Sequence, residues 1–446
     1  MQYLQKLISE YEFVSDFIKK DINGVTIVYL ESLVNQDKIN EYILKSIVKK
    51  KFVINVKSNV PAPNMVEIDN YQKLKLLLEN GYTLIFSLTK VYAIETKGNL
   101  SRTIMPPQVE STLYGPKEGM VENFQINLGL IKRRIKTNNL KNINTYVGTY
   151  TKTLTSLLFI KGKSNQRLIK EVITILRNID VDGITDISEL KRYLIKDKRF
   201  ILPNIKITER PDQIARSLMN GKLVIIMDNS PTALILPVSL ADFINPISDQ
   251  YSNKLNINFI KALRFICFFI SILTPAIYVA LTTFNQEALP SSLLISIQNQ
   301  RLTVPFPAFL ECLITLITCE ILRESDLRFP GNYGSAISIL GALVLGEAAV
   351  TAGIVSPIMI IVVAITFISS LIFTDMEMVN GLRYLRLFVL LFGSLFGIYG
   401  VLISFIMLLI YLVSYESFNL PYLYPLSPIN KKSINEVLFN LNKENL

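Results

Sequence analysis

One long apolar stretch, residues 333–373, constrains the fold of this chain more than any other feature. It reads YGSAISILGALVLGEAAVTAGIVSPIMIIVVAITFISSLIF and contains a single charged residue, Glu347. It is interrupted once, between Gly353 and Pro357, which divides it into two helices that are each long enough to cross, or nearly cross, a bilayer. The stretch therefore predicts a membrane protein.

The first of these helices is expected to have two different faces, because successive residues are turned by about 100° around a helix axis. One face is a strip that suits close helix packing. This strip consists of Gly334, Ser338, Gly341, Leu345, Ala348 and Ala352. The opposite side carries Ala336, Leu340, Leu343 and Glu347. A carboxylate facing lipid is costly, so we expect this side to face a cavity, a partner or water, with pairing of Glu347 to an arginine or a backbone group as the structural alternative.

Composition separates the chain into two parts near Phe259. The first part is charged and mixed and holds the basic excess behind the formal net charge of +10, whereas long apolar runs dominate residues 259–415. Residues 1–20 predict an amphipathic helix and not a signal peptide, and Lys261 and Arg264 precede the first apolar run. We therefore expect the N-terminal part in the cytoplasm. Its basic residues are scattered, which argues against nucleic acid as a partner.

The residue types argue against catalytic and metal chemistry. The chain has no histidine, which rules out histidine-based zinc sites, triads and pH switches. Cys267, Cys312 and Cys319 lie in apolar runs and are expected to be small core residues. The sequence contains no phosphate-binding glycine loop and no nucleophile and base at a familiar spacing. We expect neither an enzyme nor a bound cofactor or metal.

Two small α/β units are expected before the apolar region, over residues 1–100 and 101–250. In the first, strands are predicted at residues 25–30 and 82–88 and helices at 39–50 and 71–80. In the second, helices are predicted at 120–136 and 165–178, and strands at 143–149, 155–160, 223–227 and 233–238. A turn at residues 228–231 is expected to join the last two strands.

Two polar motifs of the second unit have structural explanations. TERPD, residues 208–212, is expected to begin a helix, with Thr208 as the N-cap and Pro211 in the first turn. The basic cluster consists of Lys132, Arg133, Arg134 and Lys136. It is expected to be a solvated face, with contact to anionic lipid or a neighbouring subunit as the alternative.

Five or six membrane spans are expected over residues 259–415, followed by a tail over 416–446. The first span is predicted at 265–284, with a kink at Pro275. Residues 289–303 are too polar to face lipid and should be interfacial, re-entrant or covered by protein. A short helix follows at residues 309–322. The last run, 387–415, is either one long tilted helix or a bent pair around Gly393, Gly397 and Gly400.

Two groups of charges border these apolar runs. Glu320, Arg323, Glu324 and Arg328 are expected at a cytoplasmic membrane rim, where local pairing explains them without a direct role in ion passage. Asp375, Glu377, Arg383 and Arg386 are expected to form the next polar loop, also on the cytoplasmic side.

Seven strings, taken in their order, carry a family resemblance. They are RTIMPPQVESTLYGPKEGMVENFQINLGLIKRRIK (102–136), TERPD (208–212), DNSPTALILPV (228–238), LPSSLLISIQNQRLTVPFPAFLE (289–311), EILRESDLRFPG (320–331), GEAAVTAGIVSP (346–357) and ESFNLPYLYPLSP (416–428). Together they resemble the A subunit of the GerA-type spore germination receptors. The resemblance implies an integral subunit of a nutrient-sensing complex in the spore inner membrane, beside a permease-like B subunit that receives the nutrient and a lipoprotein C subunit.

The same resemblance implies a homo-oligomeric ring, with a pentamer as one candidate, that forms a ligand-gated path for monovalent cations. In such a ring, the side from Ala336 to Glu347 would present an apolar tube with one acidic ring, which suits a cation path closed by dewetting. Three alternatives stay open: a non-conducting scaffold, a paralogue that accompanies the dipicolinate channel, and a secondary transporter. The last would need an inverted repeat, which the sequence does not display.

Overall fold

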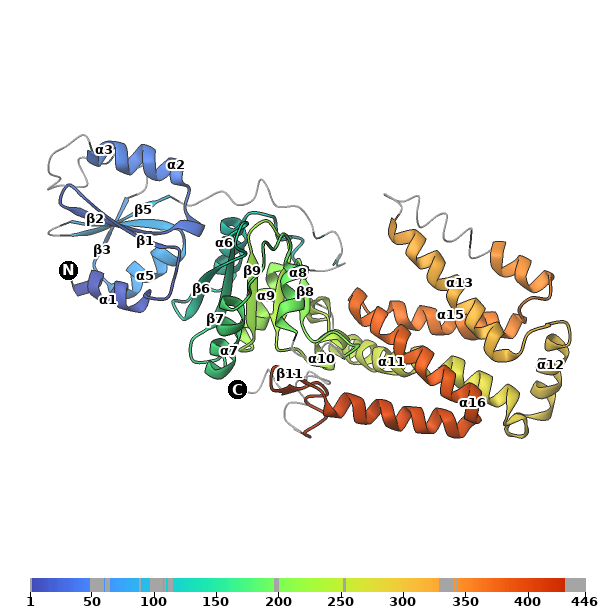
Figure 1. The fold of residues 1–446 in the computed structure, drawn as a ribbon. Coiled ribbons are helices and arrows are strands. Elements are labelled where there is room, and N and C mark those ends of the chain that lie inside the picture. Colours follow the sequence, from blue (N-terminus) through green and yellow to red (C-terminus); the bar gives the residue numbers. More distant parts are fainter. Residues whose placement is uncertain are drawn as a thin grey trace. The chain divides into compact units, whose positions relative to one another are not determined.

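The computed structural model describes residues 2–48, 60, 65–87, 90–96, 107, 110, 115–195, 200–251, 254–328, 341 and 344–429, with the backbone alone at 2, 250, 254, 255, 327 and 328. The chain forms two compact units. One comprises Met1–Asp197 and Asn204–Val238, and the other Lys198–Pro203 and Ser239–Leu446. The first is α/β and the second is helical (Figure 1). This order confirms the predicted fold class.

The first half of the α/β unit is a five-stranded antiparallel sheet in the order β1-β2-β4-β5-β3. The strands are β1 (Phe17–Ile22), β2 (Val25–Leu30), β3 (Met65–Ile68), β4 (Tyr82–Phe86) and β5 (Val91–Glu95). Side chains alternate between the two faces of a strand, so β2 supplies two cores. Val28 and Leu30 pack with α1 (Gln2–Glu10) and α5 (Tyr71–Glu79), whereas Ile27 packs with the helical run described next.

That run covers the other face of the sheet (Figure 1). It consists of α2 (Gln36–Lys38), the π-helical η2 (Ile39–Leu44) and α3 (Lys45–Val48), after the short 3-10 turn η1 (Glu31–Leu33). Asn35 caps it by accepting hydrogen bonds from the backbone N–H groups of Asp37 and Lys38. Ile39, Ile43 and Ile47 point into the core at helical spacing.

The second half of the unit is another five-stranded antiparallel sheet, in the order β6-β7-β9-β10-β8. The strands are β6 (Leu140–Val147), β7 (Thr153–Ile160), β8 (Lys206–Thr208), β9 (Leu223–Met227) and β10 (Ala233–Leu236). The helices are α6 (Phe124–Arg134), α7 (Gln166–Arg177), α8 (Ile187–Leu194) and α9 (Pro211–Met219). α6 packs with α9, and α7 packs with α8. The predicted turn at residues 228–231 joins β9 and β10 and is confirmed.

The two halves share one connectivity. In each, a helix precedes a β-hairpin, helical segments lead to the third strand, a further helix follows it, and a second hairpin completes the sheet. The strand order is also the same, since β1-β2-β4-β5-β3 corresponds to β6-β7-β9-β10-β8. α5 and α9 therefore occupy equivalent positions, and the TERPD motif lies at the strand-to-helix junction of the second half.

The helical unit begins with α10 (Leu240–Ile244), η4 (Ile247–Tyr251) and α11 (Lys254–Thr283). It continues with η5 (Gln286–Ala288), α12 (Ser291–Arg301), α13 (Ala308–Arg328), α15 (Pro357–Leu371) and α16 (Met376–Ser414), and the described part ends after the small hairpin of β11 (Glu416–Ser417) and β12 (Leu420–Pro421). α11 packs against α13, α15 and α16. Among the described residues, Asn256–Thr283 and Met376–Ser414 are long and apolar enough to cross a membrane, and α15 is a shorter apolar helix.

α16 is a bent pair of helices. Gly397, with φ 59° and ψ −142°, breaks the helix into two arms, and both arms belong to one continuous stretch in Figure 1. A Cβ at this position would lie 2.8 Å from Cβ of Phe284 and 2.9 Å from Oδ1 of Asn285. The same Asn285 Oδ1 accepts a hydrogen bond from the N–H of Ile398, the first residue of the second arm, at 3.1 Å. Of the two predicted arrangements, the bent pair is the one observed.

Three predicted elements differ in type from the observed ones. Residues 1–20 are not one helix, because α1 ends at Glu10 and β1 pairs with β2. Residues 120–122 are not helical, because Asn123 is the N-cap of α6 and accepts from the N–H groups of Gln125 and Ile126. Residues 375–386 are not a loop, because Asp375 is the N-cap of α16 and the following residues are helical.

Candidate functional site

Glu347 lies on a short helical segment that the structure describes from residue 344 to 351. Its side chain is exposed, as are the neighbouring Val344 and Leu345. Among the side chains that the structure describes, none forms an ion pair with the Glu347 carboxylate. The helix ends at the predicted break, since Gly353 has a positive φ of 69° and α15 begins at Pro357. The residues expected on the same side as Glu347, namely Ala336, Leu340 and Leu343, lie outside the described residues.

The predicted packing strip is described in part. A Cβ at Gly341 would lie 3.2 Å from Cδ2 of Leu322 on α13, so this glycine permits a close approach of the two helices. Ala348 and Ala352 are exposed within the single chain. Gly334 and Ser338 lie outside the described residues. Within the described strip, Gly341 therefore contacts α13 of its own chain, whereas Ala348 and Ala352 are exposed.

The expected rim charges form an ion-pair cluster between α13 and the first arm of α16. Oε2 of Glu320 lies 2.9 Å from Arg323 and 2.9 Å from Arg383, and both arginines donate to Oδ1 of Asn380, at 3.1 and 3.2 Å. The local pair between Glu320 and Arg323 is thus present. Arg328 ends α13, and its side chain lies outside what the structure describes.

A cavity of about 360 Å³ lies beside this cluster. Its wall combines apolar side chains of α13 with Glu320, Glu324, Arg383 and Arg386. Two carboxylates and two guanidinium groups balance each other there, so the cavity favours neither cations nor anions by formal charge. Arg386 is 3% exposed, which is unlike a loop residue. This arrangement is suited to holding α13 against α16.

Sequence reasoning missed another acid of the helical unit, the buried Glu311 on the first turn of α13. Its side chain is fully buried, and Oε1 accepts hydrogen bonds from the N–H and the hydroxyl of Ser356, at 2.7 and 2.5 Å. Ser356 is the N-cap of α15. The carboxylate therefore lies at the N-terminal ends of two helices, where the helix dipoles favour negative charge. Nε of Arg301, at the end of α12, lies 3.7 Å from Oε2.

Glu311 thus joins three helices at the break that follows the Glu347 segment. A sequence clue was present, because residues 298–301 are polar within an apolar region and end in the arginine that approaches Glu311. α12 itself buries only Ile297 within the described chain. The predicted interruption between Gly353 and Pro357 is therefore stabilised by Glu311 of α13, which bonds Ser356, and by Arg301 of α12, which approaches Glu311.

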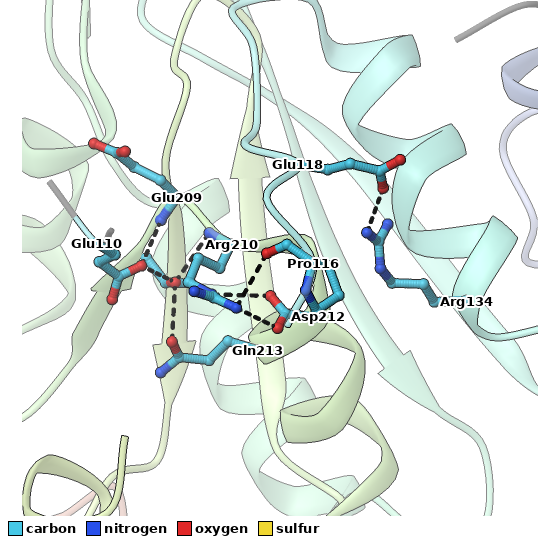
Figure 2. A network of polar contacts seen from close by, with 9 residues as sticks. Glu110, Pro116, Glu118, Arg134, Glu209, Arg210, Asp212 and Gln213 are labelled. Carbon is cyan, nitrogen blue, oxygen red and sulfur yellow. Dashed lines mark hydrogen bonds and ion pairs between the residues drawn. The ribbon is translucent and has the colours of Figure 1, made fainter. Parts of the chain in front are cut away.

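The TERPD motif forms an arginine-centred clasp in the α/β unit (Figure 2). Arg210 is 1% exposed and donates to both carboxylate oxygens of Asp212, at 3.1 and 2.7 Å, and to the carbonyl of Pro116 at 3.4 Å. Pro211 begins α9 as predicted. The N-cap is Arg210, so the assignment of Thr208 as the cap is wrong.

Thr208 instead ends β8 and donates to Oε2 of Glu110 at 2.5 Å. The N–H of Glu209 donates to the same oxygen at 3.1 Å. Burial raises the pKa of the Glu110 carboxyl, while Lys206 and these hydrogen bonds oppose the shift. The motif therefore attaches Glu110 and Pro116, which precede α6 in the chain, to the junction of β8 and α9.

The basic cluster of α6 is not a uniformly solvated face. Lys132 is buried and forms an ion pair with the buried Asp16 of the first half. Asp16 also accepts a hydrogen bond from the hydroxyl of Ser32 at 2.5 Å. Arg133 and Arg134 pair with Glu118, at 3.3 and 2.5 Å. The cluster thus fastens the two halves of the α/β unit to each other, which the sequence could not reveal because Asp16 is 116 residues away.

Cys267 and Cys312 are buried, Cys319 is half-buried, and all three are free thiols. Within the described ranges, no three acidic or thiol side chains gather as a metal site would require.

Comparisons with known proteins place these features in a context. The family described as "Bacillus/Clostridium GerA spore germination protein" matches residues 2–445. Spore germination protein KA of Bacillus subtilis (strain 168) is 36% identical over 433 residues, which cover 95% of this chain and 79% of that protein. Spore germination protein A1 of the same organism is 30% identical over 426 residues, covering 94% and 88%.

Two further similarities complete the comparison. The "Uncharacterized membrane protein YfkQ" of Bacillus subtilis (strain 168) is 32% identical over 452 residues, which cover 97% of this chain and 87% of that protein. Among solved structures, the N-terminal domain of the A subunit of the Bacillus megaterium spore germinant receptor GerK3 is 26% identical, with a TM-score of 0.38, and the match covers 52% of this chain and 92% of that chain.

Proposed function

Because the chain belongs to the GerA family of spore germination proteins, we propose that it is the A subunit of a nutrient-responsive germination receptor in the inner membrane of bacterial spores. In this proposal the α/β unit is cytoplasmic and the helical unit spans the membrane. The partners are a permease-like B subunit, which receives the nutrient, and a lipoprotein C subunit. Copies of the chain form a ring, for which a pentamer is one candidate, that conducts monovalent cations.

The observation that carries the proposal is the exposure of Glu347. Its carboxylate projects from a segment whose other large side chains are apolar and exposed, namely Val344 and Leu345. A carboxylate inside a bilayer would cost a few kcal/mol if it faced lipid. Contact with a neighbouring subunit or with a water-filled passage would remove this cost. A ring of subunits with Glu347 facing its central axis would provide both the neighbouring subunit and the passage.

The same geometry supports a way to close and open the path. Apolar side chains beside a single acidic ring form a constriction that excludes water when it is narrow and conducts when it widens. The Glu311 junction fixes the end of the segment to α13 and α15, so a shift of either helix would move Glu347. The nutrient-bound partner must favour the wider state through a difference in interaction free energy between the two states.

Purification of the full-length chain in detergent together with its partner subunits tests the assembly. We expect a homo-oligomer of defined mass that retains the permease-like subunit. A chain that remains monomeric at all concentrations would contradict the ring. An oligomer that copurifies with no permease-like protein would favour the paralogue instead of the receptor subunit.

A further inference from the structure

A short segment, Lys198–Pro203, belongs to the helical unit although the residues on both sides of it in the sequence belong to the α/β unit. The chain thus leaves the α/β unit after α8, contacts the helices, and returns at β8. Only Asn204 and Ile205 separate Pro203 from β8, and both are buried.

Phe200 anchors this segment to the end of the second arm of α16. Its ring stacks on Tyr415 and Tyr411, with centroids 3.3 and 5.0 Å away, and meets Tyr422 edge to face at 4.9 Å. The N–H of Ile201 donates to the hydroxyl of Tyr411 at 2.6 Å. Aromatic stacking and a directed hydrogen bond together fix the position of the segment against the end of α16.

Leu202 attaches the same segment to the beginning of the first arm. It is 2% exposed, and a Cβ at Gly381 would lie 2.6 Å from Cδ2 of Leu202 and 3.1 Å from the carbonyl oxygen of Ile201. Any larger residue at Gly381 would therefore displace the segment. Residues 200–203 thus contact the start of one arm and the end of the other, while the arms themselves meet at Gly397.

The second passage of the chain from the α/β unit into the helical unit reaches the same place. α10 follows β10 closely, and the N–H of Leu240 donates to the carbonyl oxygen of Tyr422 at 2.8 Å. Tyr422 is fully buried, and its own N–H donates to the carbonyl of Tyr415 at 3.0 Å. Both entry points are therefore joined to one aromatic cluster, Phe200, Tyr411, Tyr415 and Tyr422.

From this convergence we propose that residues 200–203 are a positioning element that sets the distance between the two ends of α16. Because the segment contacts both arms, a shift of residues 200–203 changes the bend at Gly397. This inference rests on the proposed receptor function. It names Phe200 and Leu202 as the residues through which the segment holds the two arms of α16.

The test uses spores that carry the full-length chain with its partner subunits as their sole receptor of this type. Phe200→Ala removes the aromatic anchor and Leu202→Ala removes the contact at Gly381. The matched control is Ile201→Ala, which keeps the N–H bonded to Tyr411 and removes a side chain that is 43% exposed. The readouts are the nutrient concentration for half-maximal cation release and the amount of chain in the membrane.

We expect Phe200→Ala and Leu202→Ala to shift that concentration about fivefold or more, as is typical of a coupling between two sites. The amount of chain should remain at the wild-type level, and Ile201→Ala should respond as the wild type does. Gly381→Ala should shift the response as well, and adding Leu202→Ala should bring it closer to wild type because the clash is relieved. The proposal would be overturned if both anchor variants responded as the wild type does. It would also be overturned if the half-maximal nutrient concentration shifted only in variants with less chain in the membrane.

A second readout separates this inference from the conduction proposal. Hydrogen exchange of the purified full-length chain in lipid nanodiscs reports on α16 whether or not the chain conducts. Phe200→Ala should increase exchange around Gly397 relative to Ile201→Ala, and equal exchange in the two variants would contradict the positioning role. Glu347→Gln should leave this exchange unchanged. The proposal that Glu347 lines a cation path is therefore tested by the ion flux, and the positioning role by the hydrogen exchange.

Discussion

Nε of Arg386 donates a hydrogen bond of 2.8 Å to the backbone carbonyl of Ser271. Pro275 lies four residues further along α11 and has no N–H to donate to that carbonyl. The guanidinium group therefore satisfies an acceptor that the proline leaves open. Inside a membrane an unpaired backbone group costs several kcal/mol, so this bond joins α16 to α11 at the position where α11 is weakest.

A double-mutant cycle between these two positions is the first prediction. Arg386→Leu leaves the Ser271 carbonyl unpaired and should lower the free energy of unfolding by about 1–3 kcal/mol. In a Pro275→Ala background the loss should be smaller, because the substituted alanine can donate its own N–H to the same carbonyl. Unfolding of the full-length chain in mixed micelles by a denaturing detergent measures all four variants. Equal losses in the two backgrounds would disprove the link.

Gly397 gives a second prediction. Its backbone conformation is one that L-residues rarely adopt, and a Cβ would approach Phe284 and Asn285 within 3 Å. Gly397→Ala should therefore lower the free energy of unfolding by about 1–3 kcal/mol from backbone strain alone. Gly346→Ala is the control, because a Cβ there meets nothing within 4 Å and alanine is the better helix former. If both substitutions were neutral, the bend would not depend on glycine.

The Glu311 junction gives a third prediction. Glu311→Ala removes the acceptor for the N–H and hydroxyl of Ser356 and leaves the Arg301 charge without its nearest acid. We expect the free energy of unfolding to fall by about 3–5 kcal/mol, which is typical when one partner of a buried charge pair is removed and the other stays buried. The exposed Glu287 provides the control, and Glu287→Gln should change stability by less than about 0.5 kcal/mol. Similar effects of the two substitutions would mean that Glu311 is not a junction.

Glu79 gives a prediction about pH. Burial raises the pKa of its carboxyl, while the hydrogen bond from the hydroxyl of Tyr11, at 2.9 Å, opposes the shift. A raised pKa means that the folded chain binds the proton more tightly than the unfolded chain. Glu79 therefore contributes stability that is complete below its unfolded pKa, about 4.3, and is lost as the pH rises through the higher folded value.

The Glu79 carboxyl should raise the free energy of unfolding as the pH falls from neutral to about pH 4.5. In Glu79→Gln this rise should be smaller. Glu110 has a raised pKa of the same origin, so its share of the gain should remain in this variant. Thermal unfolding of the full-length chain across this pH range measures the effect, and Glu41→Gln, at an exposed position, is the comparison. An unaltered pH profile in the Glu79 variant would contradict the assigned cause.

The elements with strong local patterns could be predicted from the sequence. β2 and β9 have the predicted bounds because each is a short apolar run bordered by turn residues. The break before Pro357 follows from glycine and proline chemistry. β1 could not be predicted in this way, because FIKKDI carries charged residues on both faces and is held as an edge strand by pairing with β2.

The burial of the charged residues could not be predicted from neighbouring residues in the sequence, because their partners are distant in the chain. Lys132 and Arg386 look like solvated or loop residues until Asp16 and the Ser271 carbonyl, each more than a hundred residues away, are brought to them by the fold. Arg210 and Asp212 are close in sequence, but Arg210 also donates to the carbonyl of Pro116, which is 94 residues away. Glu347, in contrast, was identifiable because it is the one charge in a long apolar stretch.

The central claim is that copies of this chain surround a cation path lined by Glu347. Planar-bilayer recordings of the purified full-length oligomer test it directly, with Glu347→Gln and Glu347→Asp compared at equal amounts of protein. We predict cation-selective currents for the wild type, a lower conductance or selectivity for Glu347→Gln, and retention of selectivity in Glu347→Asp. Absence of current from a correctly assembled oligomer, or identical currents from the wild type and Glu347→Gln, would contradict the claim.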